Sequence, residues 1–283
     1  MCRLIGVLIL LVFFIPFSSF CQYFTIDTIR AHSPYDGYHF VSYVFPHLTS
    51  ATDQAAADLI NRALMKGVLH IDSGDVYESI FQGVWVGEPS APEGIADLSF
   101  KEINNDTDFF CIAISGVDCD VNNNPFIKYY VRESKSGRAI NIEDLFLNSG
   151  LQKLSESVRI MRNKRIQRHV ELLKKIPKGG MTKDGEAPEI YLPTYKECID
   201  TSHEVHNLAS DAPDDSDLIA EGRAYKMRYL ESYALDRKTL TIRTGVCVDE
   251  VISYVDKVDY TFTFKLRRLK KYLTAYGKSL LKL

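Results

Sequence analysis

The residue types best suited to metal chemistry gather in one short run, His203-Glu204-Val205-His206, with Asp200 and Cys198 nearby. Zinc-binding helices place two histidines four residues apart, so that both imidazoles point to one ion. Here the histidines are three residues apart and no further glutamate partner is evident. In a segment this polar we expect solvated side chains and no metal site.

A second run, Asp118-x-Asp120-x-Asn122, has the beginning of a calcium-binding loop. Asn123 stands where such a loop needs glycine, and Tyr129 stands where it needs a bidentate glutamate. A hairpin turn is therefore the favoured interpretation. The acidic run at residues 211–217 is interpreted as a solvated segment. No serine lies in a Gly-x-Ser-x-Gly motif, so the sequence indicates no catalytic residues and no cofactor.

Residues 1–21 have the order of a secretory signal peptide: Arg3, an apolar run from Leu4 to Ile15, and small residues before Cys21. We expect cleavage after Cys21, which leaves Gln22 first in a periplasmic or secreted protein. An uncleaved anchor is the alternative, although apolar segments shorter than ~17 residues span a bilayer poorly. A lipid-anchored start at Cys21 is a second alternative, which the bulky preceding residue argues against. No second long apolar segment follows, so we expect no stable membrane span after cleavage.

Four cysteines follow this leader, Cys111, Cys119, Cys198 and Cys247. An even number in an exported protein predicts disulfides. Cys111 and Cys119 flank Ser115-Gly116, read as a turn, and are predicted to pair across a hairpin, which leaves Cys198 to pair with Cys247. Buried reduced thiols are the alternative. No two cysteines have the short spacing of a tetrahedral zinc site.

The charge of the chain is unevenly distributed. The formal net charge is −3, and loss of the leader, which has one Arg and no acid, lowers it to −4. We therefore expect no nucleic-acid partner. Apolar residues at helical spacing predict a long helix over Leu151–Ile176. Between Lys153 and Lys178, five Lys and four Arg stand against two Glu.

The four arginines of this basic segment, Arg159, Arg162, Arg165 and Arg168, are the candidate binding residues. They would contact an anionic envelope polymer or protein partner, for example a phosphate-bearing wall polymer, an acidic glycan, a lipid headgroup or an acidic protein. The alternative is an ordinary solvated face of a packed helix.

The remaining pattern predicts an α+β fold in which antiparallel sheet packs against a few helices. The half at residues 22–100 includes a helix over Ala55–Leu64, and it should form one compact unit with the half at residues 101–283. Residues 179–222, rich in Asp, Pro, Gly and Ser, are predicted to be a long irregular insertion. A basic helix over Leu266–Tyr276 should close the chain.

Two stretches carry a family resemblance. In the first, Tyr38–Leu64, a strand ends at a proline and a helix with Ile60-Asn61 follows. In the second, Phe126–Phe146, a strand, a Ser136-Gly137-Arg138 turn and a further strand lead to Ile142-Glu143-Asp144-Leu145-Phe146. Together they resemble an exported paired-domain family of unknown function. It occurs in the extracytoplasmic region of RsiV-type, lysozyme-sensing anti-sigma factors and in some peptidoglycan deacetylases.

This resemblance implies an exported, non-catalytic binding module for a cell-envelope component or a lysozyme-like protein. The alternatives are a hydrolase acting on envelope polymers and a structural accessory protein of the envelope. The chain shows neither a sigma-binding part nor a deacetylase domain, so the resemblance implies neither activity. Cys247–Val251 stands where the family has an aromatic stretch, so no ligand-contacting residue is carried over from the family.

Overall fold

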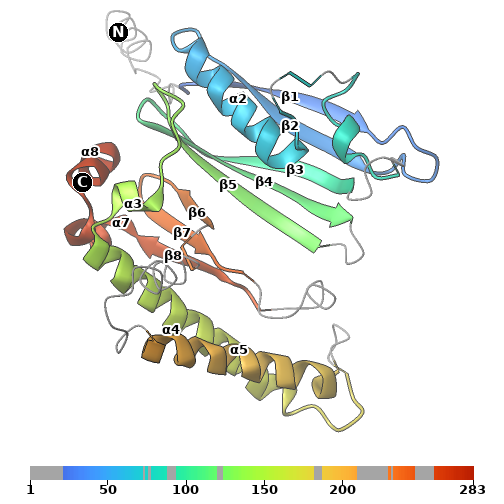
Figure 1. The fold of residues 1–283 in the computed structure, drawn as a ribbon, viewed down its shortest axis with the longest axis vertical. Coiled ribbons are helices and arrows are strands. Elements are labelled where there is room, and N and C mark those ends of the chain that lie inside the picture. The colour runs from blue at the N-terminus through green and yellow to red at the C-terminus, as the bar shows by residue number, and fades with distance from the viewer. Residues whose placement is uncertain are drawn as a thin grey trace, which may run out of the picture.

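Strands dominate the first half of the chain and helices most of the second (Figure 1). Within the described residues, eight strands form two sheets, flanked by helices, which confirms the predicted α+β class. The computed structural model describes residues 22–72, 74–75, 78–87, 94–119, 124–181, 187–208, 229–230, 232–245 and 258–283, and only the backbone of residues 124 and 200–208.

The first sheet has the strand order β1-β2-β3-β4-β5. Its neighbouring strands are antiparallel, except that β2 and β3 are joined in parallel through Tyr43 and Leu98. Residue 100, the predicted division between two halves, lies inside β3. The start of β4 is buried on both sides, so both faces of this sheet must be covered. The strands are β1 (Thr25–His32), β2 (Ser42–Thr49), β3 (Gly94–Asn105), β4 (Phe109–Cys119) and β5 (Asn124–Glu133).

Helix α2 (Gln54–Leu69) covers one face of the first sheet. Its Ile60 packs into one core with Phe110 of β4. The buried side chain of Asn61 accepts a hydrogen bond from the backbone N–H of Leu48 at 2.9 Å and donates one to the Leu48 carbonyl at 2.8 Å. Both backbone groups of one β2 residue are thus satisfied, and α2 is held against the sheet. The Ile60-Asn61 pair therefore serves packing.

The opposite face is covered by a second, antiparallel sheet of β6 (Ser232–Leu235), β7 (Thr239–Arg243) and β8 (Thr261–Lys265). Its Phe262 shares a core with Cys111 of β4 and with Val158 of α4 (Asn148–Leu173). A single 3-10 turn, η1 (Gln82–Val84), precedes β3. The layers thus run from α2 through the two sheets to α4 (Figure 1).

The segment after β5 forms a tight turn and a short helix, α3 (Ile142–Leu145). Gly137 has φ +69°, and a Cβ there would lie 2.8 Å from the Ala56 carbonyl oxygen, so glycine is required. Arg138 bridges Glu133 at 2.8 Å and Asp144 at 3.2 Å. The predicted second strand is wrong: it reduces to one bridge between Arg132 and Ala139, because α3 begins immediately afterwards.

The single predicted C-terminal helix is also wrong. The chain instead forms α7 (Leu266–Leu269), the 3-10 turn η3 (Lys270–Tyr272) and α8 (Ala275–Leu281). Leu273 is extended because it pairs with Phe146 in an isolated bridge. Thr274 then caps α8 by accepting a hydrogen bond from the Gly277 N–H at 2.9 Å. A long-range pairing therefore interrupts a locally helical pattern.

The second half of α4 and helix α5 (Pro188–Leu208) lie side by side and form a two-helix arm (Figure 1). The prediction of a long irregular insertion at residues 179–222 is wrong for residues 188–208, which form a helix. Residues 182–186 and 209–222 lie outside the described residues. Pro193 cannot donate a hydrogen bond inside α5. Tyr191 and Tyr195 nevertheless bury against α4, and this packing favours the helix despite the proline.

Candidate anion-binding site

The four candidate arginines do not lie on one face of α4. Residues three apart on an α-helix are rotated by about 60° relative to one another, so four such residues spread around half of the helix. The structure accordingly places Arg159, Arg162, Arg165 and Arg168 in four different environments.

Arg162 is buried, with 7% of its surface exposed. Its guanidinium lies over the rings of Tyr229 and Tyr260, at 5.9 and 5.5 Å from their centroids. Its Nη2 donates a hydrogen bond to Sγ of Cys198 on α5 at 3.2 Å. Its buried Nε has no hydrogen-bond partner. Arg162 thus belongs to the packing between the arm and the residues before β8, and no ligand can reach it without rearrangement of that packing.

Arg165 and Arg159 also have partners within the molecule. Arg165 donates from Nη1 to the Thr261 carbonyl at 2.8 Å, pairs with the Asp259 carboxylate at 2.9 Å and lies over the ring of Phe262. Arg159 forms a two-pronged pair with Glu156 at 2.8 and 2.7 Å. Three of the four arginines therefore stabilise α4 and its contacts.

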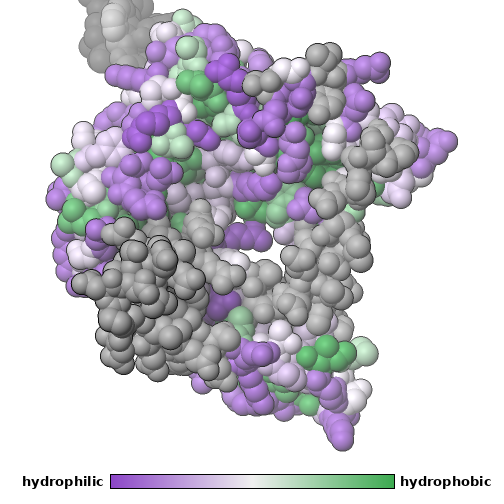
Figure 2. Space-filling model, in the orientation of Figure 1, coloured by the Kyte–Doolittle hydropathy of each residue, from purple (hydrophilic) through white to green (hydrophobic). Residues whose placement is uncertain are grey.

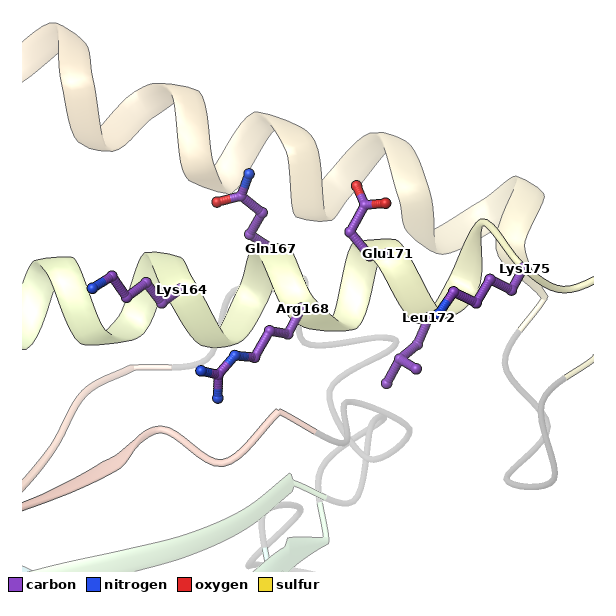
Figure 3. Close-up of a pocket in the computed structure, with 6 residues that line it drawn as sticks. All are labelled: Lys164, Gln167, Arg168, Glu171, Leu172 and Lys175. Atoms are coloured by element: carbon purple, nitrogen blue, oxygen red, sulfur yellow. The ribbon is translucent and has the colours of Figure 1, made fainter.

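Arg168 is different, because its side chain is exposed and has no hydrogen-bond or ion-pair partner among the described residues. It borders an open cavity of about 590 Å³ on the surface of α4 (Figure 3). In that view Arg168 and Leu172 extend away from α5, and Gln167 and Glu171 extend towards it. The lining residues are Lys164, Gln167, Arg168, Glu171, Leu172 and Lys175.

Three cations of this lining, Lys164, Arg168 and Lys175, form what we call the cationic face. The one acid, Glu171, already pairs with Lys174 at 2.7 Å, and this hydrogen bond lowers the pKa of the Glu171 carboxyl. The cavity therefore carries an excess of positive charge. A planar guanidinium flanked by two ammonium groups suits phosphate, sulfate or carboxylate groups.

The sequence-based prediction did not include Lys164 and Lys175, which line the cavity, because it selected the arginines by residue type. The useful signal was position. Lys164, Arg168 and Lys175 are separated by four and seven residues, a spacing that keeps side chains on one side of a helix.

The predicted bridge between Cys111 and Cys119 is wrong, and both residues carry thiols. Ser115-Gly116 is not a turn, because β4 continues through it to Cys119. The two cysteines thus lie on one strand, eight residues apart, or about 26 Å at the rise of a strand. Cys111 is fully buried, and burial raises its pKa to about 12. Cys247 lies outside the described residues, so its pairing with Cys198 stays a prediction.

The other chemical candidates have no described geometry. Asp120, Asn122 and the acidic run at 211–217 lie outside the described residues, and so do the side chains of His203 and His206 on α5. Among the side chains that are described, no group of three or more His, Cys, Asp and Glu is arranged to hold a metal ion. None of the described helices has the length and apolar character needed to cross a bilayer.

Comparison with known proteins finds no matching family profile and no matching curated protein. Among solved structures, a crystal structure of a DUF3298 family member from Bacteroides fragilis is similar to this chain. It has 11% identity and a TM-score of 0.48, over 92% of this chain and 96% of that chain. The name of that family denotes a domain of unknown function, and the RsiV-type affiliation of this chain stays a prediction.

Proposed function

We propose that this protein is an exported, non-catalytic binding module that holds an anionic component of the cell envelope on the cationic face of α4. The observation that carries the proposal is the state of Lys164 and Arg168. Both are exposed, and neither has an ion-pair partner among the described residues. The chain has 37 acidic and 34 basic residues, so acids to neutralise them are plentiful. Two cations that have no acidic partner among the described residues lie at one cavity, and this arrangement favours an anionic ligand there.

The shape of the site favours a ligand that presents repeated anionic groups over an extended surface. All described lining residues lie on α4 or in the turn that follows it at Lys175, so the cavity is open and does not enclose a small molecule. Lys164 lies within α4 and Lys175 lies in the turn after its end, eleven residues further along the chain, so the cations are spread along the arm. An envelope component with repeated phosphate or carboxylate groups can contact both ends of the face at once, and several weak contacts then add up.

The predicted RsiV-type affiliation is consistent with this proposal, since such a module binds without performing chemistry. A structural accessory protein would need no cationic face. A hydrolase acting on envelope polymers stays the alternative, and the experiment below separates the two roles.

The proposal is tested by sedimentation of residues 22–283 with purified, protease-treated envelopes. The triple variant Lys164→Gln/Arg168→Gln/Lys175→Gln should lose most of the binding seen at low salt, because the three positive charges that attract the anionic ligand are removed. Binding by the wild type should weaken steeply as the salt concentration rises above 0.1 M, because the Debye length is only about 10 Å at that concentration.

A matched control removes three exposed cations elsewhere, Lys101→Gln/Lys135→Gln/Arg268→Gln, with the same change in net charge. Equal binding by the two triple variants would overturn the proposal. Release of soluble fragments from the envelopes would indicate the hydrolase instead, and loss of binding after protease treatment would indicate a protein partner.

A further inference from the structure

We infer that the anionic component is a lipid bilayer surface, on which the end of the α4–α5 arm docks. This inference rests on the proposed function and identifies its ligand. The arm tip is defined here as the end of α4, residues 174–181 and the start of α5. Its relevant side chains are Leu172, Lys174, Lys175, Lys178, Met181 and Ile190.

Exposed apolar side chains mark this tip. Leu172, Met181 and Ile190 are 59%, 69% and 58% exposed. Single exposed apolar residues are ordinary on protein surfaces. Among the eight large hydrophobic residues that are exposed in the described part of the chain, however, these three lie at one end of one arm. A concentration of this kind is typical of an interaction surface.

The packing of the arm explains why these side chains remain outside. Tyr191 and Tyr195 of α5 fill the space against Val170 and Leu173 of α4, so the interior of the arm is already occupied. Because α5 returns along α4, the end of one helix and the start of the other lie together (Figure 1). Hydrophobic side chains are visible at this end of the arm among polar ones (Figure 2).

The charge around the tip complements anionic headgroups. Residues 164–181 and 187–199 contain seven basic and three acidic residues, in a chain whose net charge is −3. Of the tip lysines, Lys174 pairs with Glu171, while Lys175 and Lys178 are exposed. Lysine side chains can lie along apolar surface and keep the ammonium group among headgroups.

The combination of features distinguishes a bilayer from a dissolved polyanion. A soluble polymer uses only the cations, whereas interfacial binding gains from both the electrostatic attraction and the burial of apolar side chains. Leu172 borders the same cavity as Arg168, so the two kinds of contact are adjacent. The arm would lie at the headgroup level without spanning, in line with its lack of a spanning helix in the described residues.

The test uses residues 22–283 with two probes, vesicles of phosphatidylcholine with about one third phosphatidylglycerol, and soluble polyphosphate. Wild type should bind both, and should bind pure phosphatidylcholine vesicles far less. Met181→Ser/Ile190→Ser, which leaves the residues that line the cavity unchanged, should weaken vesicle binding by about tenfold or more, because each side chain loses apolar burial. The same variant should bind polyphosphate as the wild type does. The cationic triple variant should lose both ligands.

Phe40→Ser is the matched apolar control, since Phe40 is 78% exposed and lies in the loop between β1 and β2, away from the arm (Figure 1). It should leave vesicle binding unchanged. Polyphosphate binding without vesicle binding, or equal vesicle binding by wild type and the Ser double variant, would overturn the bilayer inference and leave the proposed function standing. Failure to bind either probe or whole envelopes would overturn both.

Discussion

Arg237, in the turn between β6 and β7, donates a hydrogen bond from Nε to Oδ2 of Asp106 at 2.6 Å. Asp106 lies in the turn between β3 and β4 of the other sheet. The same guanidinium also donates to the carboxylate of Asp108, and to the carbonyl of Leu280 in α8 at 2.6 Å. One side chain therefore joins a turn of each sheet to the C-terminal helix.

Arg237→Lys should lower the free energy of unfolding by about 2 kcal/mol, because an ammonium group cannot reproduce the three-way fork and leaves Asp106 poorly compensated, whereas Asp108 keeps its ion pair with Lys282. Urea unfolding at pH 7 measures the change. Lys238→Ala, at the exposed neighbouring position, is the control and should stay within about 0.5 kcal/mol of wild type. An equally small effect of both substitutions would show that the Arg237 contacts do not stabilise the fold.

The surroundings of Glu133 predict that the stability of the fold depends on pH. The hydrogen bond from Arg138 at 2.8 Å is the main reason why the pKa of Glu133 falls to about 2, and Ser136 and Tyr276 also donate to it. A carboxyl whose pKa is lower in the folded state stabilises the fold above its unfolded pKa of about 4.3, and this contribution disappears as pH falls towards 2.

Glu133→Gln should therefore cost about 1–2 kcal/mol at pH 7 and progressively less between about pH 5 and 3. Unfolding curves of wild type and variant across this range give the difference. Glu143→Gln, at an exposed site, is the comparison and should give a smaller difference at pH 7. A Glu133→Gln effect that stays constant down to pH 3 would contradict the lowered pKa.

Arg162 should be needed for its volume more than for its charge. Arg162→Ala should destabilise the protein by about 2–4 kcal/mol, because it leaves a cavity between two tyrosine rings. Arg162→Met should cost less than about 1.5 kcal/mol, since it fills the space and removes the unsatisfied Nε donor. Arg168→Ala is the exposed control. A larger loss for Met than for Ala would show that the charge is what the site requires.

Thiol labelling distinguishes the two cysteines of β4. In residues 22–283 without reductant, iodoacetamide should modify the half-buried Cys119, and Cys111 only after unfolding, because the native Cys111 is fully buried with a raised pKa. Cys198 and Cys247, predicted to be bridged, should stay unlabelled throughout. Mass spectrometry of peptides locates the label. Absence of label on Cys111 and Cys119 even in denaturant would restore the hairpin bridge.

Local pattern was sufficient for several elements of the fold. The recurrence of apolar residues predicted α2 and α4, and Ser136-Gly137 correctly marked the turn after β5. Each of these signals depends on residues a few positions apart. The mixed α+β class follows from such signals, since strands and helices each have a local sequence pattern.

Other elements depended on contacts between distant residues. Pro193 argued against a helix at residues 188–208, yet Tyr191 and Tyr195 bury against α4 and favour one. Leu273 continued a helical pattern, yet its pairing with Phe146 makes it extended. Ser115-Gly116 has turn residues, yet β4 continues because both neighbouring strands pair along it. The intrinsic helix or strand propensity of a residue contributes little to the free energy of folding, and tertiary contacts outweighed it at each of these positions.

The candidate site shows the same division. The sequence by itself determined that α4 carries an excess of basic residues, since charge can be counted without a structure. Only the tertiary structure decided what each cation does, burying Arg162, pairing Arg165 with Asp259 and leaving Arg168 exposed. The physical reason is that residues three apart face different directions on a helix, and the elements that come to lie against each direction are distant in sequence.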